Sequence, residues 1–138
     1  MVTFKSGFSP AKTLNGGLNK LTFLRYQIVK TRKISLTFEV QGENINTTEE
    51  YEMTFDFIYE KDDILARILK NMGFTEPEMK YLIIEDMLQL DNTGIGLEIM
   101  KFLGTQRGVP FLAKLVDENN DGCWGLEVKT LRPLYPNK

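Results

Sequence analysis

Alternation of apolar and polar residues in the first half of the chain predicts three β-strands. In the segment Ile34–Val40 every second residue is apolar and those between are polar or charged, which is typical of a strand with one buried face. Residues 20–30 before it are rich in β-branched and aromatic side chains, and residues 50–59 after it alternate again. Because the links are short or polar, we predict an antiparallel meander with strands at 20–30, 33–41 and 50–59.

Helical periodicity replaces this alternation in the middle of the chain. Apolar residues three and four positions apart predict a helix over residues 62–72, which Gly73 ends. Thr75 and Glu78 have the spacing of a capping box and precede further apolar residues at helical spacing. We therefore predict a second helix over residues 76–90.

The last third of the chain returns to strands after a short helix predicted at residues 95–103. Strands are predicted at 109–116 and 123–131, and the Asn-Asp-Gly sequence between them is a strong hairpin signal. Three strands, helices and a closing hairpin follow one another in the order of the OB-fold, a five-stranded barrel. We predict a mainly β protein of this kind, since closing the barrel leaves no unpaired strand edge.

The chain is expected to form one domain behind an N-terminal arm. Glycine and proline break any periodicity in residues 1–19, so we predict a flexible basic arm there and a single domain over residues 20–135. The alternative is a terminal segment that lays Phe4 and Phe8 onto the domain. Cys123 is the single cysteine, and no signal-peptide core or membrane-spanning run is present, so we expect a cytoplasmic protein.

Charge is segregated along the chain although the net charge is only −2. Residues 1–38 contain seven basic side chains and no acid, residues 39–98 have a net charge of −11, and residues 99–138 have a net charge of +2. Local potential steers binding partners where net charge does not. A surface with both signs can also serve solubility alone.

No catalytic or metal-binding motif is found in the sequence. The chain has no histidine, which removes the commonest general base and metal ligand. Gly94-Ile95-Gly96 lacks the remainder of a phosphate-binding loop. Asp117–Gly122 fits the first half of a calcium loop, but Val128 stands where a bidentate glutamate is required, so a hairpin turn is the better interpretation. We predict a protein that is not an enzyme and has neither metal nor cofactor.

Cations from both ends of the chain are the candidate binding residues. We expect one face of the first strand to point outward and the β-barrel to bring its cations beside those of the last two strands. A positive groove with an exposed ring suits single-stranded nucleic acid, because cations follow the phosphates and rings stack on bases. The predicted residues are Phe23, Arg25, Lys30, Arg32, Lys33, Lys114, Lys129 and Arg132.

The segments KISLTFEV, YEMTFDFIYE and ILARILKNMGF, with the ending FLGTQRGVPFLAKLVDENNDGCWGLEVKTLRPL, resemble a known family. Together they are similar to small OB-fold proteins of bacteriophages and mobile elements, of the single-stranded-DNA-binding type, over Leu21 to Leu134. The resemblance implies an accessory of replication or recombination in a bacterium or a phage-infected cell. It implies sequence-nonspecific binding of single-stranded DNA, homo-oligomers, replication or recombination proteins as partners, and no cofactor.

The competing hypothesis is a protein-binding adaptor, or an inhibitor of a DNA-handling enzyme. It rests on the acidic segment 39–98, which could engage a basic partner or mimic DNA. The outward faces predicted for the second and third strands also carry acids, which repel phosphate, so a DNA path would follow the first, fourth and fifth strands or the arm. A structural protein of a viral particle is a third possibility without a feature in its favour.

Overall fold

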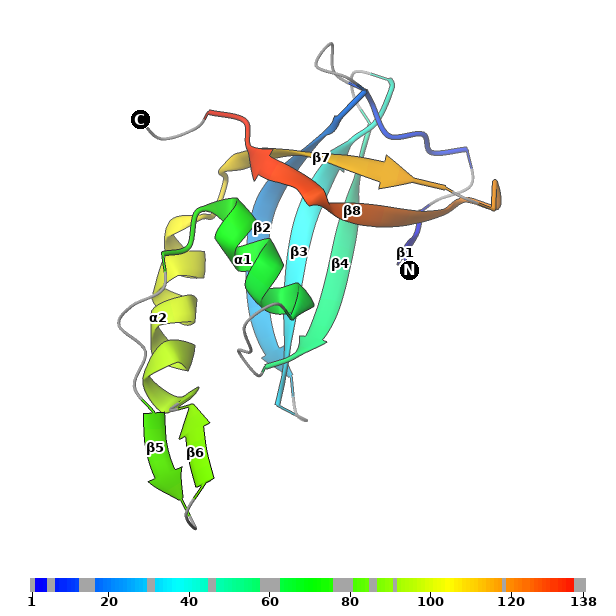
Figure 1. Cartoon of the computed structure of the whole chain (residues 1–138). Helices are drawn as coiled ribbons and strands as arrows, with labels where there is room; N and C mark the ends of the chain where they lie inside the picture. Colours follow the sequence, from blue (N-terminus) through cyan, green and yellow to red (C-terminus); the bar gives the residue numbers. More distant parts are fainter. Residues whose placement is uncertain are drawn as a thin grey trace.

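The computed structural model of the chain contains a curved antiparallel sheet, two helices and a separate β-hairpin (Figure 1). It describes residues 2–4, 7–12, 17–29, 32–44, 47–57, 63–75, 81–84, 87–90, 92–117 and 119–135.

Five long strands form most of the sheet, as predicted. They are β2 (Asn19–Val29), β3 (Lys33–Gln41), β4 (Thr48–Asp56), β7 (Pro110–Val116) and β8 (Cys123–Pro133). Their order in the sheet is β8-β7-β2-β3-β4, and every neighbouring pair is antiparallel. The two-residue strand β1 (Val2–Thr3) adds to the outer side of β8. The five predicted strands are therefore confirmed, and the first of them pairs with the fourth.

The sheet is not closed into a barrel. Closure would require a ladder between β4 and the opposite edge of the sheet, which β8 and the short β1 form, and no described residue of β4 pairs with either strand. One side chain bridges the seam instead, since the hydroxyl of Tyr51 on β4 accepts the N–H of Leu126 on β8 at 3.0 Å. The β7–β8 hairpin curls over one end of β2–β3–β4 without completing the circle (Figure 1). The predicted closed OB-fold barrel is not confirmed.

Two of the three predicted helices are present. Helix α1 (Ile64–Met72) begins at Asp63, whose Oδ1 accepts the N–H of Ile64 at 2.8 Å, and ends at Gly73, which has a φ of 115°. Helix α2 (Asn92–Thr105) corresponds to the predicted 95–103 segment. Neither described helix has the length and apolar character needed to cross a membrane.

The helix predicted over residues 76–90 is wrong. A hairpin of β5 (Tyr81–Ile84) and β6 (Met87–Leu90) lies there, and it projects beyond the end of α2 (Figure 1). Seven of the eight residues in these strands are apolar, so almost any periodicity can be fitted to them, and short apolar runs do not separate helix from strand. Part of the capping-box signal, at residues 76–80, is outside the described residues.

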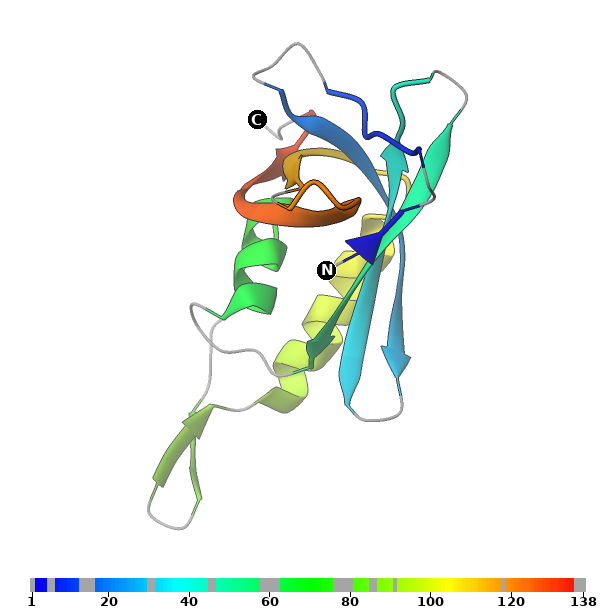
Figure 2. The ribbon, with the colours of Figure 1, turned by 90° about the vertical axis from the view of Figure 1, so that its right-hand side faces the viewer.

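The core lies between the concave side of β2–β3–β4 and the elements that cover it. Helices α1 and α2 and the β7–β8 hairpin all lie on that side, and no helix or strand of the described residues covers the other side of the three strands, the outer face (Figure 2). Ile34, Leu36, Phe38 and Val40 are each 0% exposed, which confirms the buried face predicted from their alternation. At the centre of the core, the ring of Phe38 makes edge-to-face contacts with the rings of Phe23 and Phe111.

The described part of residues 1–19 lies on the domain. Phe4 is buried against the core, and its ring centroid is 4.8 Å from that of Phe8. The buried side chain of Asn19 connects this segment to the domain. Its Nδ2 donates to the carbonyl of Ala11 at 2.7 Å, and its Oδ1 accepts the N–H of Leu115 at 2.9 Å. Both ends of this buried amide are thus satisfied, as its burial requires.

Candidate nucleic-acid interface

Phe23 does not lie on the surface, so the prediction that it forms an exposed stacking ring is wrong. Its side chain is 0% exposed. The pairing of β2 with β3 passes directly from Phe23 opposite Phe38 to Arg25 opposite Thr37, which leaves Leu24 as an extra residue in a β-bulge. A bulge shifts the alternation by one residue, so the outward face counted from Arg25 does not extend back to Phe23.

Arg25 is exposed on the outer face of β2–β3–β4, but its charge is paired. Its guanidinium forms a salt bridge with the carboxylate of Glu50 on β4. Both side chains are about half exposed, so the pair adds little stability. The ion pair does neutralise the positive charge of Arg25, which a contact with phosphate would require.

Two further predicted cations lie at the far end of β2. Arg32 occupies the turn between β2 and β3 with a φ of 55°, and Lys33 begins β3 with its Nζ 4.0 Å from Asp56. Lys20 is at the other end of β2, nine residues before Val29, which corresponds to roughly 30 Å along a strand. Arg32 and Lys33 are therefore far from any cation at the Lys20 end of β2, and the predicted convergence of all the cations in one groove is wrong. Lys30 lies outside the described residues.

Lys114 and Arg132 are brought together on the convex side of β7 and β8. Leu112 pairs with Lys20 on one side and with Arg132 on the other, which puts the three residues in one row across the sheet. Lys114 is two residues further along β7, so its side chain is on the same face. We call Lys20, Lys114 and Arg132 the basic patch; the sequence analysis missed Lys20.

An exposed aromatic ring lies close to the end of the basic patch. Tyr135 follows Arg132 by three residues and is 76% exposed. The N–H of Leu134 donates to the carbonyl of Pro110 at 3.0 Å, which keeps this part of the chain beside β7. Tyr135 can therefore offer the stacking surface that Phe23 does not, and its position after the last strand gave no sequence signal.

A bulge in β8 includes Lys129 and lies directly before Arg132 of the basic patch. Pairing with β7 passes from Leu112–Arg132 to Lys114–Glu127, so four residues of β8 oppose Ala113 alone. The hydroxyl of Thr130 completes the ladder, because it accepts the N–H of Lys114 at 2.8 Å and donates to the carbonyl of Glu127 at 2.6 Å.

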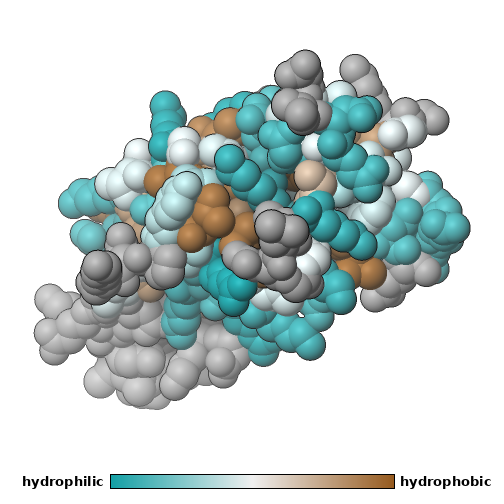
Figure 3. Space-filling model, turned by 90° about the horizontal axis from the view of Figure 1, so that it is seen from above, coloured by the Kyte–Doolittle hydropathy of each residue, from teal (hydrophilic) through white to brown (hydrophobic). Residues whose placement is uncertain are grey.

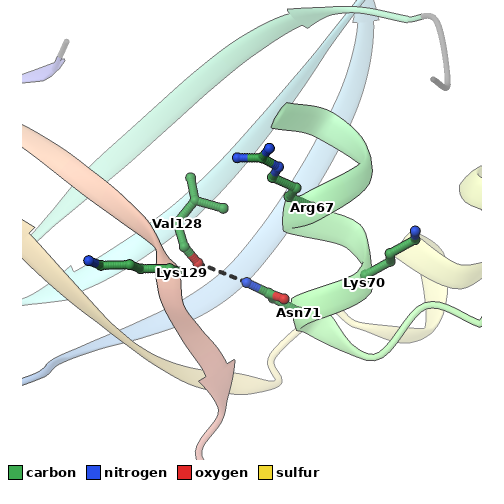
Figure 4. A pocket seen from close by; sticks show the side chains of 5 residues that line it. All are labelled: Arg67, Lys70, Asn71, Val128 and Lys129. Carbon is green, nitrogen blue, oxygen red and sulfur yellow. Dashed lines mark hydrogen bonds between the residues drawn. The ribbon is translucent and has the colours of Figure 1, made fainter. Parts of the chain in front are cut away.

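The bulge also leaves a β8 carbonyl available to α1. Asn71 on α1 donates its Nδ2 to the carbonyl of Val128 at 2.8 Å, which joins the helix to the bulge (Figure 4).

A pocket of about 360 Å³ lies where α1 meets the β8 bulge. Its lining residues are Arg67, Lys70, Asn71, Val128 and Lys129, and these described residues include no acid. Arg67 points toward β8, while Lys70 and Lys129 extend outward from α1 and β8 on either side (Figure 4). The Nζ of Lys129 is also 3.3 Å from Glu127. We call this pocket the α1–β8 groove.

The sequence analysis named Lys129 in this groove but missed Arg67 and Lys70. Both face away from the apolar stripe of α1, and their spacing of three residues puts them on one side of the helix. Helical spacing alone could have grouped them. Their proximity to Lys129 depends on how α1 packs on β8, for which the sequence has no signal.

Acids occupy the outer face of β3 and β4. The paired strands carry there Glu39, Glu50, Glu52 and Asp56, with Ser35 and Thr54 between them joined by a hydroxyl–hydroxyl contact of 2.9 Å. Arg25 and Lys33 compensate two of the acids. The prediction that acids lie on the outward faces of the second and third strands is therefore confirmed.

Comparison with known proteins adds no assignment to this geometry. No protein-family model matches the chain, and no curated protein or solved structure matches it either. Seen from above, the hydrophobic areas are small and separated by hydrophilic side chains (Figure 3).

Proposed function

We propose that the protein binds single-stranded DNA without reading its sequence, through the α1–β8 groove. The observation that carries this proposal is the set of cations Arg67, Lys70 and Lys129 around one pocket; of these, Lys129 is also paired with Glu127 at 3.3 Å. Cations that flank a groove neutralise successive phosphates and release their counterions, which supplies affinity for any sequence.

The basic patch gives the strand a path beyond the groove. Arg132 follows Lys129 by three residues on β8, and Lys20 and Lys114 adjoin it through the sheet. A strand that leaves the groove along β8 meets these cations and then the ring of Tyr135, where a base can stack. A protein that coats single strands in this way acts as an accessory of replication or recombination.

Fluorescence anisotropy of a labelled oligo-dT at two salt concentrations tests the proposal. We expect micromolar or tighter binding at low salt that weakens steeply as salt rises, by roughly 0.7 log units per log unit of salt for each phosphate contacted. The double variant Arg67→Glu/Lys129→Glu should lose most of this affinity.

The matched control reverses two exposed cations outside the groove and the basic patch, Arg32→Glu/Lys33→Glu. It changes the net charge by the same amount at the far end of β2. An equal loss in both double variants would show that total charge alone governs binding. Absence of binding at low salt would refute the DNA-binding function itself.

The acidic outer face favours a second candidate function. Glu39, Glu50, Glu52 and Asp56 together suit a protein-binding adaptor, or an inhibitor that resembles DNA to a DNA-handling enzyme. Reversal of Glu39 and Glu52 to lysine would then abolish capture of a basic protein partner, whereas the DNA-binding function predicts unchanged or tighter binding of oligo-dT.

A further inference from the structure

The strand β4 has an open edge in the described structure. The N–H of Phe57 donates to the carbonyl of Arg32 at 2.8 Å, and this fixes which residues of β4 bond to β3. Following the register, odd-numbered residues direct their backbone groups toward β3, so Glu52, Thr54 and Asp56 direct theirs away from it. No described residue pairs with these outward backbone groups.

The side chains along this edge are acidic on one face and apolar on the other. Glu52 and Asp56 are exposed on the outer face, and Glu52 has no ion pair with a described residue. Met53 and Phe55 alternate with them on the inner face, where both are only partly buried against the core. An added strand would thus meet carboxylates on one side and incompletely covered apolar side chains on the other.

We propose that the edge of β4 over Glu52–Asp56 binds an extended segment of a partner protein by strand addition. The segment has lysine or arginine at alternate positions, facing the carboxylates, and apolar residues between them, covering Met53 and Phe55. Backbone hydrogen bonds to the open edge align the segment, and the alternating side chains select it. This inference does not depend on DNA binding, and it gives the second candidate function a binding mode.

A second copy of the chain does not fit this edge. Two β4 strands paired edge to edge in an antiparallel arrangement, with their outer faces on the same side, would bring Glu50, Glu52 and Asp56 of one copy beside those of the other. Like charges across a strand pair are destabilising. Charged edges are a common way to prevent self-association, and here the same charges leave a basic partner as the complementary occupant.

The probe for this site is a fluorescent seven-residue peptide with lysine at alternate positions and valine between them. We expect it to bind the full-length protein at low salt and to protect the amide protons of Glu52, Thr54 and Asp56 from exchange. The same peptide with N-methyl groups on the backbone amides that face β4 keeps its charge but loses the donors, and we expect at least tenfold weaker binding.

Two substitutions at one position separate backbone pairing from loss of a side chain. Thr54→Pro removes an N–H that β3 does not use, and proline is tolerated on an edge strand in this orientation. Thr54→Val removes the hydroxyl that contacts Ser35 but keeps the N–H. We expect Thr54→Pro to weaken peptide binding at least tenfold and Thr54→Val to leave it within about twofold.

The urea midpoint of Thr54→Pro, followed by tryptophan fluorescence, serves as the fold control, since it does not presuppose DNA binding. Equal binding of the methylated and unmethylated peptides, or equal binding by Thr54→Pro and Thr54→Val, would overturn the proposal and leave a purely electrostatic contact. Failure of the lysine–valine peptide to bind at low salt would overturn it as well. None of these results bears on DNA binding by the groove.

Discussion

The α1–β8 groove and the outer face of β3–β4 have opposite charges and opposite origins in the chain. The groove gathers Arg67 and Lys70 from a helix and Lys129 from the last strand, more than 55 residues later. The acidic face comes from two adjacent strands joined by one loop. A surface made by neighbouring strands follows from their alternation, whereas a surface made by distant elements requires knowledge of their packing.

The largest effect that would break this comparison is the loss of the groove's positive charge. We predict that Arg67→Glu/Lys129→Glu lowers oligo-dT affinity roughly 100-fold at low salt, because two attractive phosphate contacts become repulsive. The slope of log affinity against log salt should become shallower by about 0.7 for each phosphate contact removed. Anisotropy titrations at two salt concentrations measure both, and an unchanged salt dependence would argue against phosphate contacts in the groove.

The strands β4 and β8, each of which carries part of one region, are joined across the open seam by Tyr51, so its hydroxyl should matter for stability. Tyr51→Phe leaves the N–H of Leu126 without its acceptor, and we predict a loss of about 1–3 kcal/mol in the free energy of unfolding. Urea denaturation followed by tryptophan fluorescence measures it. A change below about 0.5 kcal/mol would mean that water replaces the hydroxyl at no cost.

The same residue predicts a dependence of stability on alkaline pH. Burial raises the pKa of Tyr51 above 10.0, an effect that the N–H of Leu126 partly offsets. Above pH 10 the unfolded chain therefore ionises at Tyr51 before the folded chain does, and stability should decline as pH rises. Tyr51→Phe should show a smaller decline between pH 9 and 11, measured by urea midpoints, and an identical decline would assign the effect to other groups.

The exposed ring beside the basic patch should contribute to DNA binding, and its removal tests whether the DNA continues from the groove away from the acidic face. We predict that Tyr135→Ala weakens oligo-dT binding by about 1–2 kcal/mol, because one base loses its stacking partner, and that salt dependence is unchanged. Tyr135→Phe keeps the ring and should restore binding. If the phenylalanine variant binds as weakly as the alanine variant, stacking is not the contribution of Tyr135.

The smallest effect concerns the cation on the acidic face. Arg25→Ala removes the salt bridge to Glu50, and because both side chains are exposed we predict a change in unfolding free energy below about 1 kcal/mol. Oligo-dT affinity should stay within about twofold of the wild type. A loss comparable to that of the groove variant would place the DNA on the outer face and reverse our assignment of the two regions.

The sequence predicted the strands well where their alternation has no interruption. The bounds of β3 agree with the predicted 33–41 segment, and its four apolar residues are all buried. In β2 the bulge at Leu24 places an additional apolar residue before Tyr26, and alternation counted through it assigns Phe23 to the wrong face. A single apolar residue that interrupts a strand gives no signal by which a bulge could be recognised.

The candidate site could be predicted only in part, for two physical reasons. Cationic side chains are easy to find in a sequence, but which of them become neighbours is set by pairing partners such as Leu112 and by the bulge of β8. The open seam could not be predicted either, because the curvature of the whole sheet decides whether the barrel closes, and no local sequence pattern does. The sequence was sufficient to place Arg67 and Lys70 on one side of the helix, but not to place them beside β8.

The side-chain bridge at the seam has a consequence for local motion. Amides inside a ladder exchange with solvent when several neighbouring bonds open together, whereas the amide of Leu126 depends on one phenol at the end of a rotatable side chain. Rotation of that phenol is enough to expose it. In deuterium exchange, the Leu126 proton should therefore be replaced well before those of Leu36 and Phe38 in the middle of β3, which would mark the seam as the part of the molecule that opens first.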